Sequence, residues 1–210
     1  MMADLNSPKT ASMTATAPEI AHQIVSFDDE PLILVDENDT EVGFLPKAEA
    51  HMGGGTLHRA FSLFVFNSDG ELLLQQRAAG KRLWGQFWSN TCCSHPRRGE
   101  TMDIAIHRRL KEELGFECRF DYLFKFQYQA QFDATGAEHE LCWVYAGRSD
   151  TRPAVNANEI SAIRYIAPDA LDAEIEARPE SFTPWFKIEW ARIRAQHAGV
   201  YARQTSASLA

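Results

Sequence analysis

The segment from Thr101 to Leu114 places the strongest constraint on how this chain folds. Its apolar residues recur every four positions, at Met102, Ile106, Leu110 and Leu114. This spacing puts them in one stripe along an α-helix. Beside the stripe stand two i,i+4 ion pairs, Arg108 with Glu112 and Arg109 with Glu113. Gly115 follows as a C-terminal cap. The sequence therefore predicts a helix that buries one face and carries charged groups next to it.

Strand patterns lie on both sides of this helix. Apolar runs bounded by turn residues predict strands at 31–35 (PLILV), 41–45 (EVGFL), 57–66 (LHRAFSLFVF) and 71–77 (ELLLQQR). Asp69-Gly70 supplies the hairpin turn between the last two, and 51–55 (HMGGG) reads as a flexible loop. Two further strands are predicted at 124–132 and 138–146, and 181–197 reads as a turn into a C-terminal helix. This mixture predicts an α+β fold, a mixed sheet flanked by helices.

The 210 residues fit one domain with extensions. Residues 1–22 are rich in Ala, Thr, Ser and Pro without a hydrophobic period, so we expect a mobile N-terminal tail. We place the folded domain at 23–195 and a C-terminal tail at 196–210.

Charge and cysteine usage limit the partners and the compartment. The chain has 21 Lys and Arg against 29 Asp and Glu, a net charge of −8, which disfavours binding to nucleic acid or to a membrane surface. It has no apolar stretch long enough to span a bilayer and no secretory signal. Four cysteines, two of them adjacent, make a poor disulfide framework, so we expect the reducing cytoplasm. We interpret Cys118 and Cys142 as small core residues.

The loop and helix from Ser94 to Phe116 carry a recognisable motif. They read SHPRRGETMDIAIHRRLKEELGF, which resembles the Nudix box, G-x(5)-E-x(7)-R-E-U-x-E-E-x-G-U with U aliphatic. The positions in register are Glu100, Arg108, Leu110, Glu112, Glu113, Gly115 and Phe116. Ser94 replaces the first Gly, and Arg109 replaces the Glu after Arg. In Nudix hydrolases the carboxylates of this helix hold magnesium against a diphosphate, and oxygen ligands suit that ion. Arg109 removes one of these ligands, which argues against hydrolysis.

Three other segments extend the resemblance. They are AEAHMGGGTLHRAFS (48–62), WSNTCCSHP (88–96) and EHELCWVY (138–145). In this order around the box, over roughly 22–190, they resemble the type 1 isopentenyl-diphosphate isomerase family. The resemblance implies an isoprenoid-biosynthetic enzyme that interconverts isopentenyl and dimethylallyl diphosphate by adding one proton and removing another, through a tertiary carbocation.

The resemblance also assigns metal sites. It implies one divalent ion held by His51, His58, His95, Glu138 and Glu140. Such a mixed nitrogen and oxygen set suits Mn²⁺ or Mg²⁺, with Zn²⁺ as an alternative. A second ion, Mg²⁺, would arrive with the substrate diphosphate and lie near Glu113 and the backbone of Cys93. The strand spacing of Glu138 and Glu140 independently puts both on one face.

Catalytic and substrate-binding roles follow in the same way. The resemblance implies Lys47, Arg77, Lys81 and Arg109 as diphosphate-binding cations, with Arg82 as an alternative to Lys81. It implies Cys93 and Glu140 as the acid–base pair, Tyr128 as a relay to Glu140, and Trp185 as an aromatic face towards the cation. If the segment around Cys93 is extended, Cys93 and His95 face one way and Cys92 the other.

Other interpretations remain for these residues and for the chain. Taken singly, a histidine is more often structural than a ligand, a strand glutamate pair is usually solvated, and a C-terminal tryptophan usually packs in the core. The chain as a whole could be a Nudix hydrolase acting on a nucleoside or prenyl diphosphate, or a non-catalytic Nudix-like binding module. The combined motifs favour the isomerase, with a small diphosphate as its substrate and a monomer or weak dimer as its assembly.

Overall fold

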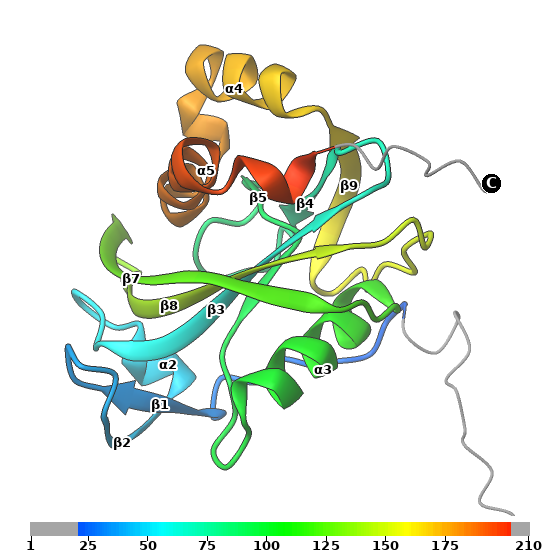
Figure 1. The fold of residues 1–210 in the computed structure, drawn as a ribbon. Helices are drawn as coiled ribbons and strands as arrows, with labels where there is room; N and C mark the ends of the chain where they lie inside the picture. The colour runs from blue at the N-terminus through cyan, green and yellow to red at the C-terminus, as the bar shows by residue number, and fades with distance from the viewer. Residues whose placement is uncertain (1–20, 203–210) are drawn as a thin grey trace, which may run out of the picture.

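The structure is a computed structural model that describes residues 21–202, and it shows an α+β arrangement of one mixed sheet with helices on both faces (Figure 1). The described strands are β1 (Pro31–Val35), β2 (Glu41–Pro46), β3 (His58–Phe66), β4 (Leu72–Arg77), β5 (Trp88–Ser89), β6 (Cys92–Ser94), β7 (Phe120–Asp133), β8 (Gly136–Arg148) and β9 (Ile160–Ile166). The described helices are α2 (Lys47–Ala50), α3 (Met102–Leu114), α4 (Pro168–Ala177) and α5 (Pro184–Gln196), with short 3-10 turns η1 (Pro179–Ser181) and η2 (Ala198–Tyr201).

Strand β3 is the centre of the sheet. It pairs in parallel with β8 and antiparallel with β1, β4 and β6, while β8 also pairs with β7 and β4 with β9. Because successive residues of a strand face opposite ways, β3 contributes to two cores. Phe61, Leu63 and Val65 pack in the cluster that contains α3, whereas Phe64 and Phe66 pack in the cluster that contains α5. The central strand is therefore covered by a different helix on each face.

Helix α3 confirms the predicted helix. Its predicted stripe is buried through Ile106, Leu110 and Leu114, and the N-cap Thr101 accepts a hydrogen bond from the backbone of Ile104. Gly115 ends the helix in the left-handed conformation with φ of 73°, which a residue with a side chain adopts less readily. Arg109 of this helix lines the pocket described below.

Several segments extend or differ from the sequence prediction. Strands β7 and β8 are longer than 124–132 and 138–146, and β5, β9 and α4 were not predicted. The first part of the predicted C-terminal tail continues the fold, because Val200 and Tyr201 in η2 pack against the α5 cluster. The predicted N-terminal tail lies outside the described residues apart from Ala21 and His22.

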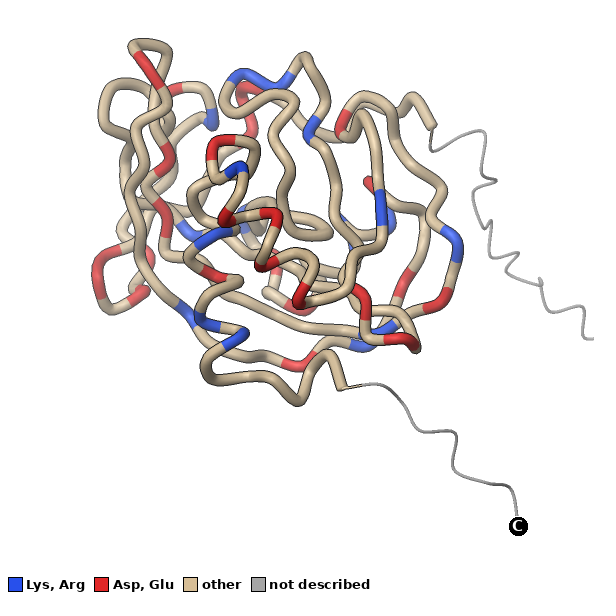
Figure 2. Tube along the Cα trace, turned by 90° about the horizontal axis from the view of Figure 1, so that it is seen from above, with Lys and Arg blue, Asp and Glu red and all other residues tan. Residues whose placement is uncertain are grey.

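Charge and helix length bear on the partners predicted above. Figure 2 shows acidic and basic residues interspersed along the described chain. Between residues 21 and 202, no helix combines the length and the apolar character that crossing a membrane requires.

Candidate active site

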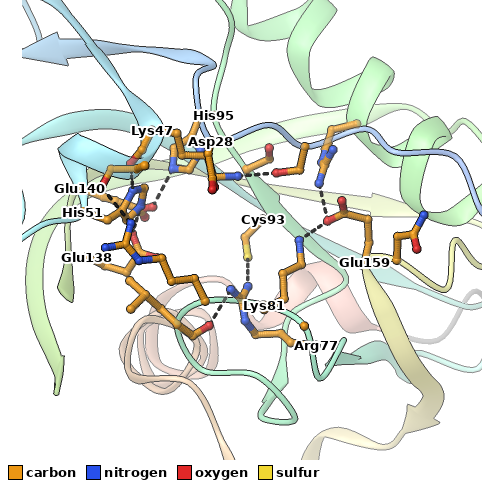
Figure 3. A pocket seen from close by; sticks show the side chains of 18 of the residues that line it. Asp28, Lys47, His51, Arg77, Lys81, Cys93, His95, Glu138, Glu140 and Glu159 are labelled. Atoms are coloured by element: carbon orange, nitrogen blue, oxygen red, sulfur yellow. Dashed lines mark hydrogen bonds and ion pairs between the residues drawn. The ribbon is translucent and has the colours of Figure 1, made fainter. Parts of the chain in front are cut away.

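A pocket of about 440 Å³ opens between the N-terminal segment, the loop after β4 and the strands β6 and β8. Ten of the predicted site residues line it: Lys47, His51, Arg77, Lys81, Cys93, His95, Arg109, Glu138, Glu140 and Trp185. Figure 3 shows histidine and glutamate side chains at one side of the pocket and Lys81 with Glu159 at the other, with Cys93 between them. Three predicted residues, His58, Glu113 and Tyr128, do not line the pocket but touch residues that do.

Strand register brings the histidine and glutamate side chains together. His58 begins β3 and lies opposite Glu140 of the parallel strand β8. His95 follows β6, whose Cys93 pairs with Ser62 of β3. His51 ends α2, and its carbonyl oxygen accepts a hydrogen bond from the backbone of Ala137 at 3.0 Å. Residues far apart in the chain thus meet at one end of the sheet.

Gly136 permits the close contact between the His51 turn and β8. A side-chain carbon built at this glycine would collide with the carbonyl oxygen of His51. The backbone there has a φ of 158°, so only a residue without a side chain fits both the space and the conformation. The position of His51 therefore depends on glycine at the start of β8.

Three imidazoles and one carboxylate converge on a common point. One ligand atom from each of His51, His58, His95 and Glu138 lies within 4.8 Å of the other three. Nδ1 of His51 donates to the carbonyl of Lys47 at 2.6 Å, and Nδ1 of His58 donates to the carbonyl of Thr56 at 2.7 Å. A neutral imidazole carries one N–H, so both Nε2 atoms are left with lone pairs.

Those lone pairs face other acceptors. Nε2 of His51 lies 2.7 Å from Oε2 of Glu138, which is buried and accepts no hydrogen bond of good geometry. Nε2 of His58 lies 3.2 Å from Nε2 of His95. Facing acceptors need a proton or a cation between them, and several acceptors that converge on one point fit a metal ion. The backbone carbonyls behind His51 and His58 orient both rings as the outer partners of metal ligands usually do.

The ionisation of His58 and His95 also suits a metal. Burial and the neighbouring His51 lower the pKa of His58 to about 4, and burial lowers the pKa of His95 well below its ordinary value. Both rings are therefore neutral, the form that binds metals. Burial alone would raise the pKa of Glu138, but His51 outweighs it and the pKa falls to about 2. Burial alone would lower the pKa of His51, and Glu138 raises it instead.

Glu140 lies between this cluster and a tyrosine. Its Oε1 is 3.2 Å from Nε2 of His95, and its Oε2 accepts a hydrogen bond from the hydroxyl of Tyr128 at 2.7 Å. Tyr128 stands directly opposite Glu140 in the β7–β8 ladder, which explains the contact. Burial and the charge of Glu138 raise the pKa of Glu140 well above its ordinary value. The pKa values of Glu140 and Glu138, two residues apart, are thus shifted in opposite directions.

The two adjacent cysteines face opposite ways, as the alternation predicted. Cys92 is fully buried in the cluster that contains α3, whereas Cys93 lines the pocket. Burial raises the pKa of Cys93 to about 12, and the nearby Arg77 acts in the opposite direction. Cys118 and Cys142 pack against the core as small residues, and all four thiols are free.

Arg77 and Trp185 form the wall next to Cys93. The Arg77 guanidinium donates to the carbonyls of Trp84 and Leu83 at 3.1 Å and lies 3.7 Å from the sulfur of Cys93. Its central carbon is 5.3 Å from the centroid of the Trp185 ring. Trp185 is buried and lines the pocket, so its ring already packs against one cation there.

Of the other predicted cations, Arg109 and Lys81 contact Glu159 at the far side of the pocket, whereas Lys47 lies next to the histidines. Arg109 is buried, and its guanidinium donates to Glu113 at 2.7 Å, Glu159 at 2.6 Å and the carbonyl of Val25 at 2.8 Å. Lys81 pairs with Glu159. Burial, followed by the charges of Lys81 and Arg109, lowers the pKa of Lys47 to about 8. The alternative to Lys81, Arg82, instead donates to the carbonyls of Ala48 and Thr135.

Sequence reasoning missed other residues that line this pocket. Glu159 and Asn158 precede β9, and Ser26 and Asp28 come from the N-terminal segment. None of them stands in a motif or at a regular spacing from the other site residues. Only the folded chain brings them to the pocket.

Comparison with known proteins agrees with this architecture. The model of the NUDIX domain matches residues 56–186. Among solved structures, a Deinococcus radiodurans protein superposes with a TM-score of 0.58 at 30% identity, covering 70% of this chain and 90% of its own. A MutT protein from Methanosarcina mazei, at 15% identity and a TM-score of 0.56, covers 67% of this chain and 95% of its own and shares the fold. The fold and the box on α3 thus define a Nudix protein.

Two curated relatives are more specific. The isopentenyl-diphosphate Delta-isomerase 1 of Photorhabdus laumondii is 46% identical over 170 residues, covering 80% of this chain and 97% of the relative. The isopentenyl-diphosphate Delta-isomerase of Pectobacterium atrosepticum is 46% identical over 162 residues, covering 77% of this chain and 90% of the relative. The chain belongs to the isopentenyl-diphosphate Delta-isomerase family within the Nudix proteins, and it is an isomerase.

Proposed function

We propose that this pocket carries out the metal-dependent isomerisation of isopentenyl diphosphate to dimethylallyl diphosphate, a step of isoprenoid biosynthesis. One observation carries the proposal: the buried carboxyl of Glu140 and the thiol of Cys93 line one pocket together with four cations that fit a diphosphate. The family relatives support the same reaction.

The histidine and glutamate cluster fits a divalent metal. His51, His58, His95 and Glu138 would hold it, with Glu140 at the edge of the set. Mn²⁺ or Mg²⁺ suits this mixture of donors, and Zn²⁺ is the alternative because imidazoles also suit it. When bound, such an ion supplies a positive charge that lowers the pKa of the adjacent carboxyl and eases its loss of a proton.

The diphosphate would bind at the other side of the pocket. Lys47, Arg77, Lys81 and Arg109 line the pocket and carry the charge that such an anion requires, with Lys81 and Arg109 at the side away from the histidines. A second ion, Mg²⁺, is expected to accompany the diphosphate near Glu113 and the Cys93 backbone. In the structure Glu113 accepts hydrogen bonds from Arg109 at 2.7 Å and Gln75 at 3.4 Å, which places it beneath this group of cations.

The proton transfers would use Glu140 and Cys93. Glu140 donates a proton to the terminal methylene carbon, whose double-bond electrons form the new C–H bond and leave a tertiary carbocation. Cys93 would act as a thiolate, whose charge the Arg77 guanidinium 3.7 Å away favours, and accept a proton from the carbon next to the one that bears oxygen. The electron pair of the broken C–H bond forms the new double bond. Before the next turnover Glu140 must regain a proton, for which Tyr128 is placed as the relay, and Cys93 must release the one it has taken. The buried face of Trp185 favours the cation formed between the two steps.

The setting of the enzyme is part of the proposal. We place the isomerase domain at residues 23–195 and the protein in the cytoplasm, where its four free cysteines stay reduced. We expect a monomer or a weak dimer acting on a small diphosphate.

One experiment tests the proposed reaction. The protein is incubated with isopentenyl diphosphate and Mg²⁺ in D₂O, the product is followed by NMR, and released phosphate is assayed. Deuterated dimethylallyl diphosphate without phosphate release is the expected result. Phosphate release would show a hydrolase instead, and no turnover would indicate a binding module.

A further inference from the structure

Glu159 is a buried carboxylate that joins two of the cations of the pocket. Its side chain is 4% exposed. One of its oxygens, Oε2, accepts a hydrogen bond from Arg109 at 2.6 Å and also forms the ion pair with Lys81. Figure 3 shows the contact between Glu159 and Lys81 at the side of the pocket away from His51. Two donors that share one acceptor atom must lie side by side.

Two neighbouring cations would not stay together without this charge. Their repulsion is weakly screened because Arg109 is buried and Lys81 is largely covered. Arg109 is also fixed by Glu113, whereas Lys81 has no second ion pair in the described residues. Lys81, on its flexible stem, is therefore the side chain that would turn away if Glu159 lost its charge.

The ionisation of Glu159 agrees with this arrangement. Burial alone would raise the pKa of Glu159, but Arg109 and Lys81 outweigh it and hold the pKa below its ordinary value. The carboxylate is thus charged at neutral pH, and it also opposes the cations that lower the pKa of Lys47.

The backbone around Glu159 connects the two elements that carry the cations. The carbonyl of Glu159 accepts a hydrogen bond from Ala78 at 2.9 Å, at the start of the loop that carries Lys81. The backbone N–H of Glu159 donates to the carbonyl of Asn156. The backbone N–H of Asn156 in turn donates to the carbonyl of Glu113 on α3. The loop before β9 therefore holds the Lys81 loop against the helix that carries Arg109.

We propose that Glu159 is a positioning residue that holds Lys81 beside Arg109 and so prepares a pair of cations for the two phosphates of the substrate. This inference rests on the proposed function, because it assumes that a diphosphate binds there. Glu113 does not do the same, because it contacts Arg109 and makes no ion pair with Lys81.

The test is Glu159→Gln, which keeps the shape of the side chain and removes its charge. Since a hydrogen bond to a charged group is worth about tenfold or more in affinity, we expect the Michaelis constant for isopentenyl diphosphate to rise about tenfold. We expect kcat to stay within about threefold, because Glu159 contacts Arg109 and Lys81 and neither of the proton-transfer groups, Glu140 and Cys93. Glu180→Gln, at an exposed position, is the matched control and should leave both constants unchanged.

A double variant with Lys81→Met tests whether Glu159 acts by positioning Lys81 or by a general structural role. If Glu159 acts through Lys81, then Glu159→Gln introduced into Lys81→Met should raise the Michaelis constant little further. A full tenfold rise in that background would overturn the proposal, as would an unchanged Michaelis constant or a loss confined to kcat in the single variant. Should Glu159→Gln fail to fold, Glu159→Asp takes its place, with a smaller rise expected and no rise overturning the proposal.

Calorimetric measurement of magnesium pyrophosphate binding tests this inference independently of the proposed function, because it requires no turnover. If the wild-type protein does not turn over isopentenyl diphosphate, the proposed function fails. The dissociation constant of pyrophosphate should still rise about tenfold in Glu159→Gln, by the same hydrogen-bond argument. An unchanged constant would reject the positioning role alone.

Discussion

The buried carboxyl of Glu189 should make the free energy of unfolding of this protein depend on pH. Glu189 lies on α5, one turn after Trp185, and is completely buried. The thiol of Cys142 donates to its Oε1 at 3.5 Å, while its Oε2 is buried without a hydrogen-bond partner. Burial raises the pKa of Glu189 to about 8, against an ordinary value of 4.5, although the contacts with Ser62 and Cys142 act in the opposite direction.

The sign and size of the effect follow from this shift. The folded protein holds the proton of Glu189 up to about pH 8, whereas the unfolded chain releases it near pH 4.5. The group therefore favours folding fully below pH 4.5 and progressively less as the pH rises to 8. Each pH unit in that window costs about 1.4 kcal/mol, so the free energy of unfolding should fall by about 2 kcal/mol between pH 6 and pH 7.5 because of this group.

Glu189→Gln removes the titration and keeps a neutral side chain of the same shape. Urea unfolding of the metal-free protein at pH 6 and pH 7.5 gives the free energy of unfolding for wild type and variant. Between these two pH values, the wild type should lose about 2 kcal/mol more than the variant. Other titrating groups are common to both proteins and cancel in the difference. Glu180→Gln, exposed at its position before α5, should behave as the wild type. Equal losses in wild type and Glu189→Gln would refute the reasoning.

Four further outcomes are expected. His58→Ala should lose bound metal and activity together, and full metal content with normal turnover would reject the ligand set. Cys93→Ala should abolish isomerisation with fold and metal content intact, while Cys92→Ala keeps most activity; normal turnover of the first would contradict the assignment. Arg109→Glu should raise the Michaelis constant at least tenfold, since it reverses a buried charge beside the diphosphate, and an unchanged constant would remove Arg109 from substrate binding. Gly136→Ala should weaken metal binding at least tenfold, because the new methyl displaces the His51 turn; a variant with wild-type affinity by calorimetry would disprove that dependence.

Local periodicity predicted those parts of the fold that bury a regular stripe. The four-residue spacing on α3 was confirmed, because Ile106, Leu110 and Leu114 pack in one core cluster. The alternation that separates Cys92 from Cys93 was confirmed in the same way. Helix α4 was missed because Leu171 is its single buried residue, so its sequence has little apolar stripe to detect.

The candidate site was predictable only where motifs gathered several residues at fixed spacing. Motif resemblance predicted His58 and Glu140 as site residues. In the structure they are register partners in the adjacent parallel strands β3 and β8, which a long connection separates in the sequence. Glu159 and Arg109 are 50 residues apart, and their contact depends on how the loop before β9 docks on α3. No spacing within one strand or helix encodes such a contact, so sequence patterns alone could not reveal it.

The replacement at Arg109 changes what the box on α3 can do. A glutamate at this position would add a carboxylate beside Glu113 and Glu159, and such a group of negative charges requires cations. With arginine there, two protein cations, Arg109 and Lys81, face the two carboxylates, so their charges balance within the chain. The side of the pocket with Arg109 and Lys81 thereby carries cations, while the convergent imidazoles lie at the other side, next to Glu140. Under the proposed function, this separation would place the diphosphate of the substrate near Arg109 and Lys81 and its carbon end near Glu140.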